Sequence, residues 1–268
     1  MKEEHPAKGA GSGVHPQFIQ ALDRGLMMLE ALGDEEKDAS LAKLAALFPW
    51  DKSTTHRLLA TLRRRGYVDQ DPETGRYRLG LALLKLSGAL NQHLDIRRSA
   101  AVPVEHLALA SRETAHLAVY DRGEVVILLQ TDSPEKVRIH TYAGMRLPAH
   151  CSSLGKVLLA GMAPEELEQW GREAGLQRYT EQTLGDLRSL KAHLVQVGRQ
   201  GYGADDQEYE AGIRCLASPV KNSEGQVVAA VGISGPSHRL AAEKHPHYIE
   251  LVKSAAAKIS RSIGFVAP

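Results

Sequence analysis

Residues 51–68 read DKSTTHRLLATLRRRGYV, and this stretch decides the fold of the N-terminal part of the chain. Leu58, Leu59 and Leu62 recur at helical spacing and share one face with Thr55. Gly66 ends the predicted helix. The opposite face is mainly polar or cationic, and it carries Ser53, His56, Arg57, Ala60 and Arg64.

The segments on either side complete a recognisable outline. A helix from about Gln17 and a second, short helix between an N-cap at Ser40 and Pro49 precede the stretch. Two strand-like runs, YVDQD and RYRLG, follow it on either side of a PETG turn. Three helices followed by a hairpin predict a winged helix-turn-helix over residues 17–80.

The third predicted helix concentrates positive charge within a segment that is neutral as a whole. The whole chain of 268 residues has a formal net charge of only +1, so any binding of a polyanion has to come from a local patch. Between Lys52 and Arg65 every charged residue is basic, although residues 1–80 carry equal numbers of basic and acidic side chains. A solvated face, or cations that complement the dipole at the helix C-terminus, is the alternative to DNA binding.

The pattern nevertheless favours double-stranded DNA as a partner. The short polar side chains at the start of the helix suit base edges, and Arg57 suits bidentate contact with guanine. Arg63 and Arg65 suit phosphate, and the ribbon places further arginines near the adjacent backbone. The predicted DNA-binding residues are Lys52, Ser53, Thr54, His56, Arg57, Arg63, Arg64, Arg65, Arg76 and Arg78.

The rest of the chain mixes helices with hairpin-connected strands. Residues 81–98 predict a helix that joins two domains, and residues 99–268 predict an α+β domain on an antiparallel sheet. The predicted strands are THLAVY, EVVILLQ, VRIHTYAG (137–144), IRCLASPV and QVVAAVGIS. The predicted helices cover residues 99–111, 153–162, 164–175, 184–201 and 243–262.

The termini and the cysteines bound the cellular setting. Residues 1–16 hold Gly, Ser, Pro and charge with nothing to bury, and predict a flexible tail. No apolar signal segment and no run of 18 apolar residues occurs, so we expect a soluble, cytoplasmic protein without membrane contact. The two cysteines, Cys151 and Cys215, are too few for a disulfide framework.

Two separate stretches resemble one known family. LAKLAALFPWDKSTTHRLLATLRRRGYVDQDPETGRYRLG is similar to the winged helix of IclR-type (isocitrate lyase regulator) transcription factors. LPAHCSSLGKVLLA, GYGADDQEYEAGIRCLASPV and VVAAVGISGP resemble its effector domain. The resemblance implies a GAF-like effector domain, a homodimer or dimer of dimers on a palindromic operator, repression, and no catalysis. It also implies a small-molecule effector, often a carboxylate or an aromatic acid.

The same resemblance implies the effector-binding residues. Members that bind small acids tend to have Gly-Ala in place of Ser153 and Leu154, and Ser in place of Gly232. These departures disfavour a glyoxylate-like ligand, and Gly232 is expected to leave more room on the strand side. The implied effector-binding residues are Ser153, Leu154, Asp205, Cys215, Gly232 and Ser234.

The residues support an anion site without the family. Ser152 and Ser153 open a helix, whose free N–H groups and positive dipole end suit a carboxylate. If Asp205 faces the same site, it would bind a ligand hydroxyl or amine, or share a proton with a ligand acid. The alternatives are simple capping for the serines and a small core residue for Cys215.

Other readings of these motifs remain open from sequence alone. One alternative is that the effector domain is a hydrolase or an acyl-transfer enzyme, because Ser153 and Lys156 match the S-x-x-K motif of serine acyl-enzymes. The partner motifs SDN and KTG are absent from the sequence. His150, Cys151 and Cys215 form at most a partial metal site, and we expect neither a metal nor a cofactor. A winged helix that binds protein instead of DNA is a third alternative.

Overall fold

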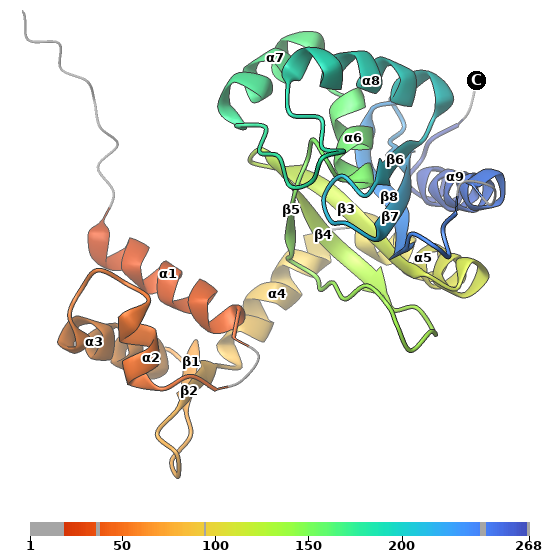
Figure 1. The fold of residues 1–268 in the computed structure, drawn as a ribbon. Coiled ribbons are helices and arrows are strands. Elements are labelled where there is room, and N and C mark those ends of the chain that lie inside the picture. The colour runs from red at the N-terminus through yellow and green to blue at the C-terminus, as the bar shows by residue number, and fades with distance from the viewer. Residues whose placement is uncertain (1–18, 36–37, 94, 242–244, 267–268) are drawn as a thin grey trace, which may run out of the picture. The chain divides into compact units, whose positions relative to one another are not determined.

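The computed structural model describes residues 19–35, 38–93, 95–241 and 245–266, so the predicted tail of residues 1–16 lies outside the described residues. The chain divides into two compact units, Met1–Gln92 and His93–Pro268 (Figure 1). Each unit has a core of its own.

The N-terminal unit consists of helices and a two-stranded ribbon, as the sequence predicts. The ribbon pairs Val68 with Leu79 and Gln70 with Tyr77 in antiparallel register. Ala39 adds an isolated bridge to Tyr77, which the sequence did not predict. The elements are α1 Gln20–Gly33, α2 Leu41–Ala46, α3 Lys52–Arg64, β1 Val68–Gln70, β2 Tyr77–Leu79 and α4 Ala82–His93.

The core of this unit joins the first and third helices to the ribbon. Leu59 of α3 is fully buried and packs in one cluster with Met28 of α1 and Val68 of β1. Helix α1 forms as predicted, but Ile19 and Leu22 of its apolar stripe are 71% and 61% exposed. The sequence therefore predicted the helix correctly without identifying its buried face.

The helical stretch after the ribbon is divided differently from the prediction. Helix α4 ends at His93 and α5 spans Asp95–Ser111 without a break. The boundary between the two helices therefore lies a few residues before the predicted position between residues 98 and 99. Pro103 lies inside α5, where it costs the helix one backbone hydrogen bond.

The C-terminal unit is built on one six-stranded sheet in the order β5-β4-β3-β8-β7-β6, and every neighbouring pair is antiparallel. This confirms the predicted α+β class. The strands are β3 Thr114–Asp121, β4 Glu124–Thr131, β5 Arg146–Pro148, β6 Gly203–Asp206, β7 Ile213–Lys221 and β8 Val227–Pro236. The helices after α5 are α6 Ser153–Ala160, α7 Pro164–Glu173, α8 Leu187–Gln200 and α9 His245–Ser262.

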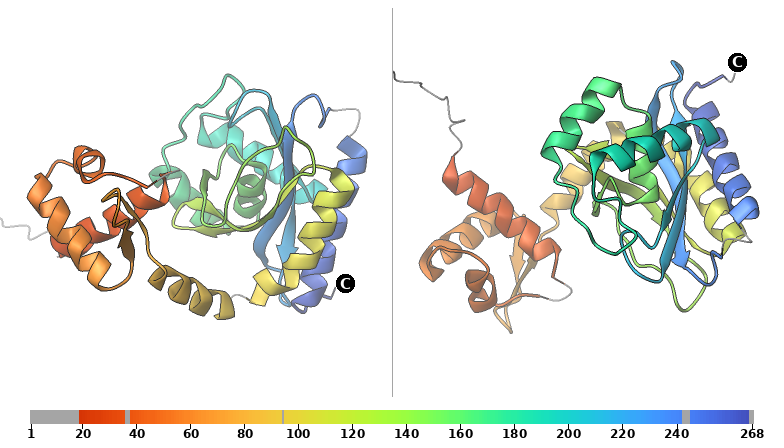
Figure 2. Two further views of the ribbon diagram at one scale, coloured as in Figure 1. Left: turned by 90° about the horizontal axis from the view of Figure 1, so that it is seen from below. Right: turned by 45° about the horizontal axis from the view of Figure 1, so that its top comes forward.

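Helices cover both faces of the sheet (Figure 2). Helices α5 and α9 lie side by side on one face, where Leu117 of β3 belongs to their core. Helices α6, α7 and α8 lie on the other face, where Ala118 of β3 joins the core of Leu154 and Leu158. Alternation along β3 thus sends odd-numbered and even-numbered side chains into different layers.

One predicted strand is wrong. Residues 137–144 (VRIHTYAG) form no strand; the segment is held by side chains instead, since the Thr114 hydroxyl donates to Ile139 O at 3.0 Å. The short strands β5 and β6, which the sequence did not predict, complete the sheet edges. Among the described residues, no helix is long and apolar enough to cross a membrane.

Candidate DNA-binding surface and effector site

Helix α3 begins at a well-formed side-chain cap. The carboxylate of Asp51 accepts from Thr54 N at 2.8 Å, from the Ser53 hydroxyl at 2.6 Å and from the Thr54 hydroxyl at 2.9 Å. The Ser53 hydrogen bond, followed by those from Thr54, lowers the pKa of Asp51. Both hydroxyl hydrogens serve the cap, so these two residues can offer only oxygen lone pairs to a partner.

The predicted reading face of α3 is open to solvent. Ser53, His56, Arg57 and Arg64 are exposed, whereas Thr55 on the opposite face is fully buried. Among the described residues, the guanidinium groups of Arg57, Arg64 and Arg65 form no hydrogen bond or ion pair within the protein. Their guanidinium groups are therefore available to an outside partner.

Three other predicted arginines have partners within the unit. Arg63 donates to the side-chain oxygen of Gln70 on β1. Arg76 donates to the carbonyl of Asp38 at 3.0 Å, and Arg78 lies 3.7 Å from the Asp38 carboxylate. These contacts fix the ribbon beside the segment before α2, an arrangement that the sequence did not reveal.

Four residues form a continuous row across the sheet of the C-terminal unit. Asp205 of β6 pairs with Cys215 of β7, Cys215 pairs with Ser234 of β8, and Ser234 pairs with Thr114 of β3. Directly paired residues point to the same face of a sheet. The structure thus brings together Asp205, Cys215 and Ser234, which the family resemblance had named separately.

Helix α6 starts over the same face. Ser152 caps it by accepting from Gly155 N at 3.2 Å and donates its own hydroxyl to Pro148 O at 2.8 Å. Ser153 is buried, and its carbonyl lies next to Gly203 of β6. The amide groups of Ser153 and Leu154 cannot bond within the helix, so they are available to an acceptor.

The carboxyl group of Asp205, the one acid in the row, has a raised pKa. Burial is the main cause that raises the pKa of Asp205 to about 7. One of its oxygens accepts from Glu208 N at 2.7 Å. Burial also raises the pKa of the Cys215 thiol well above its ordinary value, which disfavours a reactive thiolate.

Two of the predicted effector residues differ from expectation in what they contact. The side chain of Leu154 is buried in the core with Ala118 and Ala217. The expected extra room at Gly232 is wrong. A Cβ there would lie 2.5 Å from Leu216 O and 2.9 Å from Ala217 Cβ, so the glycine accommodates the neighbouring strand.

A buried ion pair lies beside the row, and sequence reasoning missed it. Lys156 of α6 is fully buried and donates to the carboxylate of Glu208 and, at 2.9 Å, to Ala204 O. Its ammonium is therefore engaged, which removes the base that an S-x-x-K enzyme would need for Ser153. A single lysine in the apolar helix SLGKVLLA was the available signal for a buried partner.

The partial metal site predicted from cysteine and histidine has other contacts. His150 Nε2 lies 2.8 Å from Gln177 O, and the His150 ring packs at 6.1 Å against that of Tyr179. Burial raises the pKa of Cys151 to about 12. Within the described ranges, no group of three or more His, Cys, Asp or Glu side chains is placed to hold a metal ion.

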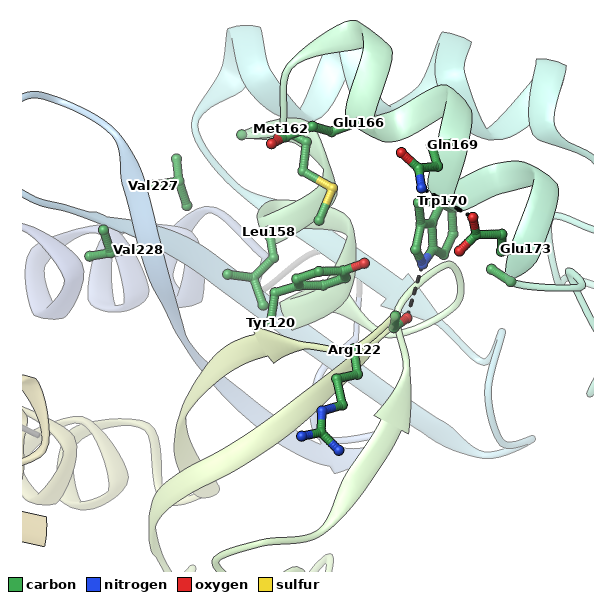
Figure 3. Close-up of a pocket in the computed structure, with 13 residues that line it drawn as sticks. Tyr120, Arg122, Leu158, Met162, Glu166, Gln169, Trp170, Glu173, Val227 and Val228 are labelled. Atoms are coloured by element: carbon green, nitrogen blue, oxygen red, sulfur yellow. Dashed lines mark hydrogen bonds between the residues drawn. The ribbon is translucent and has the colours of Figure 1, made fainter. Parts of the chain in front are cut away.

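A groove of about 750 Å³ lies elsewhere on this unit (Figure 3). Tyr120, Met162 and Trp170 line it, and none of the predicted effector residues does. It lies at the C-terminal end of α6, where the helix dipole disfavours an anion. The Trp170 indole donates to Gly123 O at 2.9 Å and fixes α7 beside the β3–β4 turn.

A winged helix-turn-helix with free arginines, joined in one chain to a sheet domain with a polar row beneath a helix N-terminus, defines the class of protein. The chain is a ligand-responsive, DNA-binding regulator of transcription. Residues 21–72 match the IclR helix-turn-helix domain, and residues 88–261 match the bacterial transcriptional regulator IclR C-terminal domain. The chain therefore belongs to the IclR family.

The relatives agree with this assignment. The chain is 34% identical over 250 residues to the HTH-type transcriptional regulator KdgR of Escherichia coli K12, covering 93% of this chain and 95% of KdgR. It is 34% identical over 259 residues to the repressor AllR of the same strain, covering 97% and 96%. A crystal structure of an IclR homolog complexed with 4-hydroxybenzoate, from Microbacterium hydrocarbonoxydans, matches with a TM-score of 0.79 at 28% identity, covering 91% of this chain and 99% of that one. These relatives are regulators, and not enzymes.

Proposed function

We propose that the first half of α3 reads base edges in the major groove while Arg63, Arg64 and Arg65 anchor the helix end on phosphate. The observation that carries this proposal is the exposed guanidinium group of Arg57, which has no partner inside the described part of the chain. Residues 17–80 would form the DNA-binding domain, 81–98 the linker and 99–268 the effector domain.

We propose a homodimer, or a dimer of dimers, on a palindromic operator. The support is an apolar surface that the N-terminal unit leaves uncovered. Leu22 of α1 is 61% exposed and Leu84 of α4 is 67% exposed, and Ile19, Leu26, Leu81 and Leu86 are also more than half exposed. A second copy would cover such residues, and two-fold symmetry of the protein would match the symmetry of the operator.

We propose a small organic acid as the effector, bound between the start of α6 and the row Asp205, Cys215 and Ser234. Free amide groups and the positive end of the α6 dipole suit a carboxylate. Asp205 has a raised pKa and suits a hydroxyl or a shared proton. The 4-hydroxybenzoate complex of the Microbacterium homolog supports an acid as the ligand.

The regulator would repress transcription, as the name of AllR indicates for that relative, and would release DNA when the acid binds. It would act in the cytoplasm, where a bacterial chromosome lies. Release requires the acid to bind more tightly to one arrangement of the dimer's two DNA-binding domains than to the other.

The DNA-binding proposal is tested by gel shift on a duplex from the promoter region nearest the coding gene and on random duplex. Arg57→Ala should lose about 1–3 kcal/mol on the specific duplex and much less on the random one, because a bidentate guanine contact carries discrimination. Arg65→Ala is the control and should weaken both duplexes alike. Equal losses on both duplexes for Arg57→Ala would show that this residue reads no base.

The effector proposal is tested by a thermal-shift screen of small and aromatic carboxylates on the full chain. A bound acid should raise the melting temperature by mass action. Ser153→Phe should abolish the shift, because the new ring fills the start of α6. A Ser153→Phe protein that still responds to the same acid would place the ligand elsewhere.

A further inference from the structure

A buried histidine on β3 carries hydrogen-bonding capacity that the protein does not use. His116 is 1% exposed, and its Nε2 atom has no partner within the described ranges. Among the described side chains, four buried nitrogen or oxygen atoms lack a partner, and that of His116 is the one on a strand. An unpaired buried polar atom costs free energy, so its retention calls for an explanation.

His116 lies close to the row formed by Asp205, Cys215, Ser234 and Thr114. It shares the α6 face of β3 with Ala118, and it pairs with Gly232 of β8. Gly232 is two residues before Ser234 on β8. His116 therefore lies on the same face as Asp205, Cys215 and Ser234, in the adjacent row of cross-strand pairs. No side chain at position 232 separates the imidazole from β7.

A chain of hydrogen bonds decides which ring nitrogen carries the hydrogen. The Gln130 amide donates to Asp132 at 3.2 Å, so its oxygen is the atom that receives the Thr141 hydroxyl hydrogen at 2.5 Å. Thr141 has no second hydrogen, so its contact of 3.2 Å with His116 Nδ1 requires that nitrogen to be the donor. Nε2 is then a bare lone pair.

The ring also stays neutral near pH 7. Burial is the main cause that lowers the pKa of His116 to about 4, and only Asp132 opposes the shift. A neutral ring whose hydrogen is on Nδ1 can only accept at Nε2. Whatever satisfies this atom must bring an O–H or N–H group.

We infer that His116 Nε2 accepts a hydrogen bond from a hydroxyl of the effector, which makes the effector a hydroxy-substituted organic acid. The inference rests on the proposed effector site and names its ligand class. The amide donors at the start of α6 take the carboxylate, and the sheet takes the hydroxyl. A keto acid or a plain acid leaves Nε2 unpaired and binds more weakly.

The Glu208 carboxylate supports the same class. Its Oε2 atom is also buried and without a partner among the described residues, and the backbone N–H of Glu208 donates to the Asp205 carboxylate. A second unused acceptor next to α6 suits a molecule with more than one hydroxyl. The sheet side of the site therefore offers acceptors, and the helix side offers donors.

Isothermal titration calorimetry on the full chain tests this with matched acids. The pairs are lactate with propionate and with pyruvate, glycerate with lactate, and 4-hydroxybenzoate with benzoate. In at least one pair the acid with the additional hydroxyl should bind the wild type about 10- to 100-fold more tightly, the loss expected when a buried acceptor is left unpaired. His116→Phe should reduce that ratio to about one. The matched control is His193→Phe, because His193 on α8 also has an unpartnered Nε2 but lies off the sheet.

The outcomes separate this inference from the site itself. A selectivity ratio that survives in His116→Phe, or a wild type that shows no preference in any pair, overturns the inference, while Ser153→Phe still reports whether acids bind there. Nitrogen NMR of His116 in the wild type provides a measurement without a mutation. Nδ1 should be protonated and Nε2 bare, with only Nε2 shifting when the hydroxy acid is added. A proton on Nε2 in the free protein contradicts the inference.

Discussion

Helices α3 and α6 begin in the same way and end up with opposite chemistry. Each starts after a residue whose side chain accepts from a backbone N–H three residues on, Asp51 in α3 and Ser152 in α6. In α3 the lysine of the first turn, Lys52, is exposed. In α6 every residue from Ser153 to Leu159 is buried, and Lys156 has no exposure at all.

The difference lies in the surroundings and not in the local sequence. Helix α3 packs one face on a small core, and its other face and cations stay in water. Helix α6 is enclosed by α8 and the sheet, so each polar group on it must find a partner or cost free energy. An exposed helix start suits a polyanion that arrives from outside, whereas an enclosed one suits a small molecule.

The largest expected effect concerns the two lysines. Lys156→Met should lower the free energy of unfolding of the C-terminal unit by about 3–5 kcal/mol, because it leaves the Glu208 carboxylate buried without its cation. Lys52→Met, the control on α3, should change stability by less than about 0.5 kcal/mol. Urea unfolding followed by Trp170 fluorescence in a Trp50→Phe background isolates this unit, since the chain has two tryptophans.

Replacing both partners distinguishes a lost pair from a general packing defect. The Lys156→Met, Glu208→Leu double variant should recover much of the lost stability, because no buried charge remains. If Lys156→Met costs less than about 1 kcal/mol, the carboxylate is solvated and α6 is not enclosed as described.

The second effect is a pH dependence that belongs to the α6 side. The raised pKa of Asp205, about 7, means that between pH 4 and 7 the folded chain keeps a proton that the unfolded chain has lost. Rising pH therefore lowers the stability of the wild type relative to Asp205→Asn, by up to about 1.4 kcal/mol per pH unit. The opposite contribution of His116, whose lowered pKa costs stability as pH falls below its ordinary value, is present in both proteins and cancels.

Urea titrations of both proteins at pH 4, 5, 6 and 7 measure the difference. Above pH 7 it should level off, because Asp205 is then ionised in both states. A constant difference across the whole range would mean that Asp205 titrates normally and is not enclosed with the row.

The smallest effect compares a serine at each helix start. Ser152→Ala should cost about 1 kcal/mol, because Gly155 N loses its acceptor at the start of a buried helix. Ser53→Ala should cost less than about 0.5 kcal/mol, because its hydroxyl is exposed and bonds only to Asp51. Thermal unfolding of each unit compares the two, and equal costs would argue against the contrast between the helices.

Much of the N-terminal unit was predictable because its contacts are local. The spacing of Leu58, Leu59 and Leu62 oriented α3, and the PETG turn fixed the ribbon. The buried face of α1 was not predictable, because its sequence offers two apolar stripes and only the tertiary contacts of Met28 choose between them. The partners of Arg76 and Arg78 on Asp38 depend on a bridge between distant residues.

The effector site shows the same limit more strongly. The family resemblance named Asp205, Cys215 and Ser234, but only strand register shows that they form one row. Lys156 meets Glu208 across 52 residues of sequence, and no local pattern encodes that contact. The segment 137–144 was mistaken for a strand because its β-branched and aromatic residues suit one, whereas Thr114 and His116 hold it by side-chain bonds.

The salt dependence of operator affinity tests the central contrast most directly. Fluorescence anisotropy measures the affinity of the full chain for its promoter duplex from low to high salt. The logarithm of the binding constant should fall steeply and linearly with the logarithm of the salt concentration, because counterions are released from the DNA. Arg65→Ala should reduce that slope by about one, and Ser153→Phe on the enclosed helix should leave it unchanged. An affinity that barely depends on salt, or a slope that Ser153→Phe changes as much as Arg65→Ala does, would contradict the account.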